Sequence, residues 1–287
     1  MMTTVQDYVA LSKPRIVLLL LITCYAAMIV ANRGVPDPAL TGFTLLGLAL
    51  SAGGANAVNM WYDRDIDPVM ERTRTRPVAA GRVAPAHALA AGIGGGLIGG
   101  AVLWAAVGAL AAAIALGGYL FYVLVYTMWL KRRTPQNIVI GGAAGAFPPL
   151  VGWAAVTHGV ALAPVLMFLI IFLWTPPHFW ALALYKQDDY RRAGIPMMPI
   201  VQGELRTKIQ ALSYTILLVG ASLLLYRTGV VGLWYLAAAA VLGVGFVAYV
   251  VAQLREAPPA DRWARRTFRY SLVYMLVLFV AMVANVR

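Results

Sequence analysis

The sequence predicts an all-α membrane protein, a bundle of nine transmembrane helices with a cytoplasmic N-terminus. Its composition excludes an ordinary soluble globule, because 61% of the 287 residues are hydrophobic, only 12% are charged and the mean hydropathy is +0.76. Nine apolar runs are each long enough to cross a hydrocarbon core about 30 Å thick. We expect these spans at residues 16–32, 39–60, 85–104, 108–129, 137–156, 163–184, 208–226, 232–252 and 267–285.

The boundary between the third and fourth spans lies at Val107 and Gly108, where the two runs nearly merge. Cys24 is the only cysteine and falls in the first span, which excludes an intrachain disulfide, a two-cysteine zinc site and an iron–sulfur cluster. We expect residues 1–287 to form a single integral-membrane domain, because no soluble domain is appended to the spans.

Basic residues predict the orientation of the bundle. With a cytoplasmic N-terminus, all but three of the 23 lysines and arginines fall in cytoplasmic segments, and only Arg33, Arg227 and Arg287 fall outside. The C-terminus is then external. The net charge of +12 is explained by this topology, so anionic lipid headgroups are sufficient partners and a nucleic-acid partner is not required.

One glycine-rich run imitates a cofactor motif. Residues 94–99 fit the pattern GxGxxG, but they lie inside an apolar span with no preceding strand, so the dinucleotide-binding interpretation fails. We interpret this run, and the glycines of the fifth span, as positions where helix backbones approach closely.

An acidic cluster follows the second span. Asn59, Asp63 and Asp67 are spaced i, i+4, i+8, so a helix carries them along one face with each step about 6 Å apart. Oxygen ligands in this arrangement suit Mg²⁺, which usually takes one or two carboxylates plus substrate phosphates. Arg72 and Arg76 follow, and arginine is a typical partner of the same anion. The pattern predicts a site for Mg²⁺ and a phosphorylated substrate, the alternative being a solvated loop of paired charges.

Other charged residues give weaker signals at the same end of the helices. Asp188 and Asp189 follow the sixth span and are equally compatible with a functional site and a solvated turn, but we expect the two acidic clusters to converge over one cavity mouth. Lys13 and Arg15 precede the first span, where contact with a diphosphate and snorkelling to lipid phosphates are both open.

Three further residues complete the candidates. Asp65 is turned about 100° per residue away from the face of the first acidic cluster, so we expect it to pair with an arginine. Lys131 and the two arginines after it are interpreted mainly as a topology anchor. His178 follows two prolines that interrupt the backbone hydrogen bonds of the sixth span. Metal-porphyrin ligation, proton transfer and simple hydrogen bonding are all open to it.

Six stretches spread over most of the chain carry a resemblance to a known family. They are Ser12-Lys-Pro-Arg-Ile16, Asn59-Met-Trp-Tyr-Asp-Arg-Asp-Ile-Asp67, Arg72-Thr-Arg-Thr-Arg-Pro77, Thr134-Pro-Gln-Asn-Ile-Val-Ile-Gly-Gly142, Trp174-Thr-Pro-Pro-His-Phe-Trp180 and Asp189-Tyr-Arg-Arg-Ala-Gly-Ile-Pro-Met-Met-Pro199. In combination they resemble the UbiA superfamily of intramembrane prenyltransferases and, within it, the protohaem IX farnesyltransferases.

The resemblance implies a UbiA-like bundle in a bacterial cell inner membrane, in which a farnesyl group passes from farnesyl diphosphate to a vinyl group of haem b. Water is added, and haem O and diphosphate are the products. The resemblance further implies Mg²⁺ on Asp63 and Asp67, catalysis with Asn59, His178 as the candidate haem ligand, and a haem A synthase as a candidate partner. The residues implied to bind the diphosphate are Lys13, Arg15, Arg72, Arg76, Lys131 and Asp189.

One departure from the family pattern keeps alternatives open. A second Asp-x-x-x-Asp motif, carried by many quinone-type relatives, is incomplete here, because Ala193 stands four residues after Asp189 and Tyr185 four residues before it. The alternatives are a related enzyme that prenylates a quinone precursor or chlorin, and a cation-coupled transporter. Carriers usually place ionisable residues at mid-membrane depth, whereas these acids cluster at one membrane face.

Overall fold

The computed structural model describes residues 5–287, and within this range the chain forms nine helical spans of membrane length. They are α2 (Pro14–Asn32), α3 (Pro38–Tyr62), α4 (Pro85–Ala106), α5 (Ala109–Leu120) continued by the π-helix η2 (Phe121–Leu130), α6 (Asn137–Gly141) with α7 (Ala143–Thr157), α8 (Leu162–Tyr185), α11 (Glu204–Leu224) with η3 (Leu225–Thr228), α12 (Leu233–Arg255) and α13 (Arg262–Ala284). The nine expected spans are confirmed. The helices α11 and α13 begin at 204 and 262 rather than at 208 and 267, because their charged first turns continue the helix beyond the apolar run.

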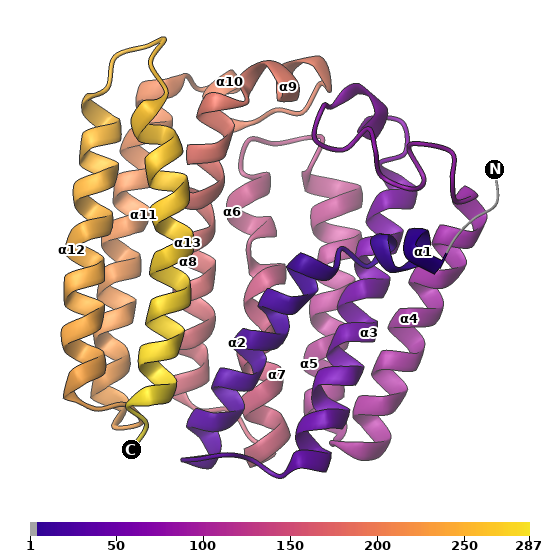
Figure 1. The fold of residues 1–287 in the computed structure, drawn as a ribbon, viewed down its shortest axis with the longest axis vertical. Coiled ribbons are helices and arrows are strands. Elements are labelled where there is room, and N and C mark those ends of the chain that lie inside the picture. Colours follow the sequence, from indigo (N-terminus) through magenta and orange to yellow (C-terminus); the bar gives the residue numbers. More distant parts are fainter. Residues whose placement is uncertain (1–4) are drawn as a thin grey trace.

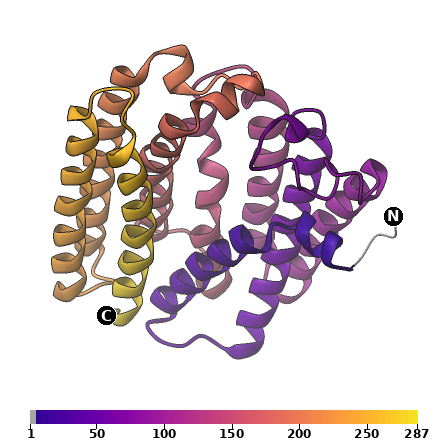
Figure 2. The ribbon, with the colours of Figure 1, turned by 45° about the horizontal axis from the view of Figure 1, so that its top comes forward.

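The charged connections gather at one end of the bundle. Figures 1 and 2 show the long connection after α3, which includes the short helix η1 (Asp67–Val69), at the same end as α9 (Gln187–Arg192) and α10 (Met198–Val201). The short helix α1 (Val5–Leu11) lies directly before α2 in the chain. The two acidic segments therefore meet at one end of the bundle, as expected, but Asp188 and Asp189 do not line the cavity over which they were predicted to converge. The cytoplasmic placement of this end stays a prediction.

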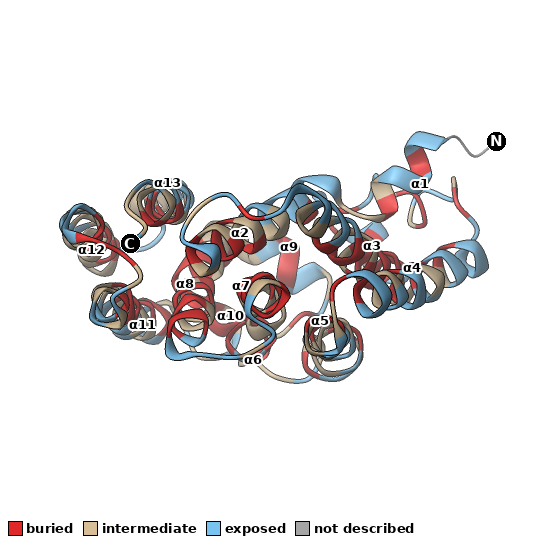
Figure 3. Cartoon of the chain, turned by 90° about the horizontal axis from the view of Figure 1, so that it is seen from below, coloured by how far each residue is buried: buried red, intermediate tan, exposed pale blue. Residues whose placement is uncertain are grey.

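The cross-section of the bundle is elongated. Seen along the helices, α11, α12 and α13 form a group at one end, α3, α4 and α5 form a group at the other, and α2, α7 and α8 lie between them (Figure 3). The most extensive pairings join α3 to α4, α2 to α7 and α8 to α11. The central helices thus connect two packed groups of helices.

Glycines allow α3 and α4 to pack with their backbones in contact. A Cβ atom built on Gly54 would lie 2.6 Å from the carbonyl oxygen of Gly92, and one built on Gly99 would lie 2.5 Å from that of Gly47. No side chain fits at such a separation, so the GxGxxG run serves helix packing, as expected. The turn at Gly108 is also confirmed, and its φ of +144° is a conformation that favours glycine.

The prolines of the sixth span do not break it. The helix α8 continues through Pro176 and Pro177, which corrects the expectation of an interruption there. Proline removes a backbone donor and is nevertheless tolerated in membrane helices where neighbouring groups satisfy the freed carbonyls.

A dense apolar cluster fills the bundle beneath its charged end, between α2, α3, α4, α5 and α7. Every member of this cluster is less than 9% exposed, and Cys24 and Leu103 are fully enclosed. We call it the lower core; it consists of Cys24, Met28, Leu48, Leu103, Val107, Ala111, Ala112, Ala115, Val151, Ala154 and Ala155. Such packing leaves no room for a ligand among these side chains, so the lower core closes the bundle on this side.

Candidate active site

The first acidic cluster lies where α3 ends. Asp63 caps the C-terminus of α3, and Asp67 begins η1, so the expectation that one helix carries Asn59, Asp63 and Asp67 fails after Asp63. Two backbone hydrogen bonds nevertheless continue the helical spacing. The amide of Asp63 donates to Asn59 over 2.9 Å, and that of Asp67 donates to Asp63 over 2.8 Å. The three side chains are therefore still about one helical turn apart.

Asp63 is fully buried and is held by partners from another part of the chain. Its carboxylate accepts hydrogen bonds from the Nδ2 atom of Asn59 over 2.9 Å and from the ammonium of Lys131, 68 residues away in sequence. Arg132 approaches the other carboxylate oxygen at 3.5 Å. The interpretation of Lys131 as mainly a topology anchor is therefore wrong, because a buried carboxylate requires a close cation and Lys131 supplies it.

Asp67 is also buried and faces a cavity. Both of its carboxylate oxygens accept from the Nη1 atom of Arg76, at 2.9 and 2.8 Å, and the hydroxyl of Thr73 donates to its backbone carbonyl over 2.9 Å. Asp65 lies outside this group and pairs with Arg132 at 2.6 and 2.7 Å, which confirms that it binds an arginine. This hydrogen bonding holds the pKa of Asp65 below its usual value. The solvated-loop alternative is excluded for Asp63 and Asp67, because both are enclosed.

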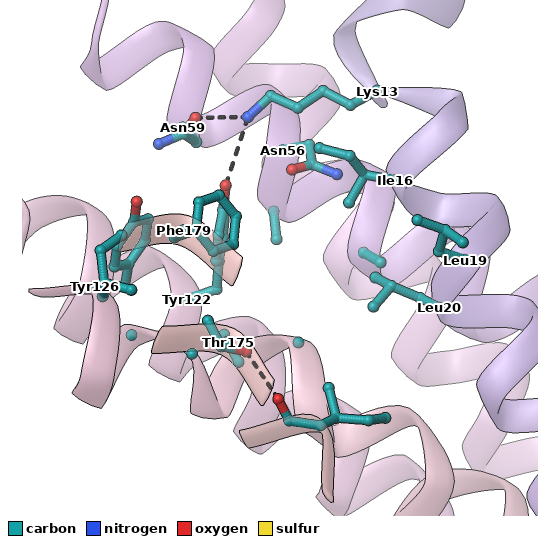
Figure 4. A pocket seen from close by; sticks show the side chains of 18 of the residues that line it. Lys13, Ile16, Leu19, Leu20, Asn56, Asn59, Tyr122, Tyr126, Thr175 and Phe179 are labelled. Carbon is teal, nitrogen blue, oxygen red and sulfur yellow. Dashed lines mark hydrogen bonds between the residues drawn. The ribbon is translucent and has the colours of Figure 1, made fainter. Parts of the chain in front are cut away.

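Lys13 extends the charged group from α2. It adopts a left-handed backbone conformation, with φ of +53°, at the junction of α1 and α2. Its ammonium donates to the Oδ1 atom of Asn59 over 2.7 Å and approaches the hydroxyl of Tyr122 at 3.4 Å (Figure 4). Strained backbone conformations of this kind concentrate at functional sites. Burial, followed by the charges of Arg76 and Lys131, lowers the pKa of Lys13 well below its usual value.

The charge of the cluster is suited to an anion. Lys13, Arg72, Arg76 and Lys131 line the cavity, whereas Asp67 is the only acidic residue among its described lining residues. Burial also lowers the pKa of Lys131. Mutual repulsion and desolvation raise the free energy of crowded cations, and an anion that binds among them lowers it again. The arrangement therefore favours a multiply charged anion over a neutral ligand.

The cavity itself continues far beyond these charges. It has a volume of about 420 Å³ and is bounded by α2, α3, α5 with η2, α6, α7, α8 and α13. Apart from the charged end, most of its surface is apolar or aromatic (Figure 4). A site of this kind accommodates a molecule with an anionic head and a long hydrocarbon body.

Sequence reasoning missed the tyrosines of this cavity. Tyr122 and Tyr126 come from η2, stack on each other with ring centroids 5.4 Å apart, and both line the cavity. The available signal was that the two tyrosines are four residues apart and precede Lys131. This signal is weak, because many aromatic residues near helix ends belong to an interfacial belt.

The opposite wall of the cavity carries His178. Its ring is 6% exposed and stacks between Trp174 and Phe268, with centroids 4.2 and 4.6 Å away. Its Nδ1 atom lies 2.7 Å from the hydroxyl of Ser271. That hydroxyl donates its hydrogen to the carbonyl of Phe268 over 2.7 Å, so Nδ1 must be the donor in the contact with Ser271. In this neutral tautomer the Nε2 lone pair is available on a residue that lines the cavity.

The second acidic segment is placed differently. Asp189 is 4% exposed, bonds to Arg192 within the same short helix, and accepts from the amide of Glu71 over 3.4 Å. It does not line the cavity, although its neighbour Tyr190 does. Arg15 is exposed and also lies outside the lining. The structure therefore brings Lys13, Asn59, Asp67, Arg72, Arg76, Lys131 and His178 to one cavity, with Asp63 directly behind its wall.

The residues present fit Mg²⁺ of the kind that shares its ligands with a substrate. Among residues 5–287 there is no group of three or more acidic, histidine or cysteine side chains placed to hold a metal ion. Two carboxylates one turn apart and the amide oxygen of Asn59 remain, and Mg²⁺ commonly completes such a set with water and substrate phosphates.

Comparisons with known proteins agree with this geometry. The pattern of the UbiA prenyltransferase family matches residues 20–273. The chain belongs to this family. The protoheme IX farnesyltransferase of Symbiobacterium thermophilum is 59% identical over 98% of this chain and 94% of its own length. That of Acidiphilium cryptum is 49% identical over 98% of this chain and 91% of its own.

Solved structures confirm the UbiA-like fold. A digeranylgeranylglyceryl phosphate synthase superimposes with a TM-score of 0.80 at 19% identity, covering 98% of this chain and 97% of its own. A UbiA homologue from Archaeoglobus fulgidus, bound to GPP and Mg²⁺, superimposes with a TM-score of 0.63 at 16% identity, covering 97% and 99%. The UbiA-like fold predicted from the sequence is therefore confirmed.

Proposed function

We propose that this chain transfers the farnesyl group of farnesyl diphosphate to a vinyl group of haem b, with addition of water, to give haem O and diphosphate. The observation that carries the proposal is one continuous cavity with a cation-rich end, an apolar body and an available histidine nitrogen on its far wall. Relatives that match nearly the whole chain bear the name of this activity. The place of action is a bacterial inner membrane, and a haem A synthase is the proposed consumer of the product.

The diphosphate binds at the charged end. Lys13, Arg72, Arg76 and Lys131 contact its oxygens. While the site is free of substrate, Asp67 holds Arg76 and Asp63 holds Lys131 in position. Asp63 and Asp67 would hold Mg²⁺, which neutralises charge on the departing diphosphate. Because Arg76 and Lys131 already occupy these carboxylates, binding requires the two cations to turn from carboxylate to phosphate. Once they have turned, these cations stabilise the diphosphate as its bond to the allylic carbon breaks.

The apolar body of the cavity protects the allylic cation that remains. Tyr122 and Tyr126 lie directly beneath Lys13 and Asn59 (Figure 4), so their ring faces are close to where positive charge develops. Aromatic faces attract a cation, and a cavity that excludes bulk water prevents its premature hydrolysis. The vinyl group of the second substrate then attacks the cation from the α8 side.

Haem b binds against α8 and α13. Ser271 fixes the tautomer of His178, and the rings of Trp174 and Phe268 fix its orientation, so Nε2 is prepared for an axial bond to iron. The stacked rings also offer an aromatic surface to the porphyrin edge. This wall has no charged residue among its described lining residues, which suits a large flat and mostly apolar acceptor.

The test is mass analysis of haems extracted from membranes of a host that lacks haem O activity and expresses this chain. We expect a farnesylated and hydrated haem with the intact chain and none with Asp67→Asn at equal membrane abundance. A prenylated quinone precursor or chlorin in place of the haem product would assign the chain to another acceptor. If the protein inserts correctly but shows no metal-dependent release of diphosphate, the result would favour the cation-coupled transporter instead.

A further inference from the structure

One arm of the cavity descends from the charged end between α3, α5 and α7. On α3 its lining runs from Asn59 down to Leu48, a distance of about 16 Å at the helical rise per residue. On the α5 side it runs from Tyr126 down to Ala115. The other arm of the cavity, toward α8 and α13, carries His178. The arm beneath the cations is thus the continuation of the diphosphate site.

The arm borders the lower core at its far end. Leu48 and Ala115 belong both to the cavity lining and to the lower core, so they form the boundary between open and filled space. Both are about 5% exposed or less. Phe147 from α7 also lines the cavity and packs against α5, since a Cβ atom on Gly118 would lie only 3.1 Å from its Cγ. Residues of α2 such as Ile22 line another side. We refer to Leu48, Ala115 and Phe147 as the floor.

The depth of the arm matches three isoprene units. The twelve main-chain carbons of a farnesyl group, joined by bonds of about 1.5 Å, span about 14 Å when extended. A fourth unit adds about 5 Å by the same geometry, and a chain that continues along the arm would then enter the lower core. There it would meet Leu103 and its fully packed neighbours, whose displacement costs free energy.

We propose that the floor sets the maximum length of the prenyl chain, with Leu48 as the residue that excludes a fourth isoprene unit. The inference rests on the proposed function for the kind of chain that fills the arm. Leu48 does so because its side chain stands at the end of the α3 lining, and removing it opens space continuous with the arm. Ala115 acts in the opposite sense, because a larger side chain there fills the arm from the α5 side.

The experiment offers solubilised enzyme equal amounts of geranyl, farnesyl and geranylgeranyl diphosphate with haem b and measures the three products by mass. Leu48→Ala is expected to raise the ratio of geranylgeranyl to farnesyl product by about tenfold or more, within the range that pocket-size differences produce. Ala115→Leu is expected to shift the ratio toward geranyl by a similar factor. Unchanged ratios in both variants would overturn the proposal.

Leu103→Ala is the matched control. It makes the same chemical change in the same lower core, at a fully buried leucine that does not line the cavity. Both substitutions destabilise the fold by leaving a void, but only the void at Leu48 connects with the arm. An equal shift in Leu103→Ala would show that general loosening, and not the floor, controls chain length.

A binding measurement separates this proposal from the proposed function. Displacement of a bound farnesyl diphosphate analogue by the three diphosphates, without haem, reports the length preference alone. If wild type farnesylates haem but Leu48→Ala alters neither product nor binding preference, the floor proposal fails and the function stands. If wild type produces no prenylated haem while Leu48→Ala shifts binding toward the longer chain, the function fails and the floor stands.

Discussion

The two acidic segments after α3 and α8 resemble each other in sequence and differ in structure. They meet at one end of the bundle, where the amide of Glu71 donates to Asp189 and Lys186 reaches Glu71 at 3.3 Å. Asp63 nevertheless binds a lysine 68 residues away, whereas Asp189 binds an arginine three residues away in its own helix. A distant partner places the first acid within the tertiary structure around the cavity. The charged partner of Asp189 is local, and its segment is a short helix outside the cavity lining.

The energetics of the two segments differ accordingly. Removing one member of a buried pair such as Asp63 and Lys131 typically costs about 3–5 kcal/mol, because a charge is left buried without compensation. Asp188 and Arg191 pair at 2.7 Å with both side chains mostly exposed, and such a pair typically contributes about 0–1 kcal/mol. Loss of a charge from the first segment is therefore expected to destabilise the fold around the cavity. Loss of the exposed charge of Asp188 from the second segment should have little effect.

The largest expected effect is that of Asp67→Asn. We expect the rate of haem farnesylation to fall at least about a hundredfold, since the site loses charge where the leaving diphosphate must be stabilised. The measurement is the initial rate at equal amounts of inserted protein. Asp188→Asn, the same change in the second segment, is the control and should retain wild-type activity. Comparable losses in both variants would remove the distinction between the segments.

A second prediction concerns His178, the candidate haem ligand on α8. His178→Ala should weaken haem binding by about tenfold, the range seen when metal-ligand shells are disturbed, while leaving farnesyl diphosphate binding near its wild-type value. The readouts are the haem absorption spectrum and separate titrations of the two substrates. Ser271→Ala should give a smaller weakening and an altered spectrum, because His178 loses the partner that fixes its tautomer. Equal loss of both substrates would indicate a folding defect instead.

A third prediction uses pH. The pKa of Lys13 is lowered by burial and by neighbouring cations, so its proton is lost at a lower pH than that of an exposed lysine. Only the protonated form attracts diphosphate, and the KM for farnesyl diphosphate should therefore rise several-fold as pH increases from neutral to alkaline values. Lys13→Arg should flatten this rise, because arginine keeps its charge throughout the range. An identical pH profile in Lys13→Arg would show that another group titrates.

The sequence predicted the spans well, because membrane thickness imposes a minimum length on every apolar run. It also identified Asn59, Asp63 and Asp67, since their spacing survives the end of the helix through two backbone hydrogen bonds. It did not predict that Lys131 binds Asp63, because such a contact depends on how two distant spans pack. Local spacing was likewise insufficient to show which of Lys13 and Arg15 faces the cavity.

The smallest expected effect is that of Asp189→Asn, and it tests the comparison most directly. Asp189 is buried but lies outside the cavity lining, and its partners are Arg192 and the amide of Glu71. An asparagine oxygen can still accept from both, so we expect activity within about threefold of wild type, as for loss of a local ion pair. Arg192→Gln, which removes the partner instead, should behave alike in a rate assay. A loss in Asp189→Asn as large as in Asp67→Asn would mean that this carboxylate turns toward the diphosphate during turnover, and the two segments would then form one divided site.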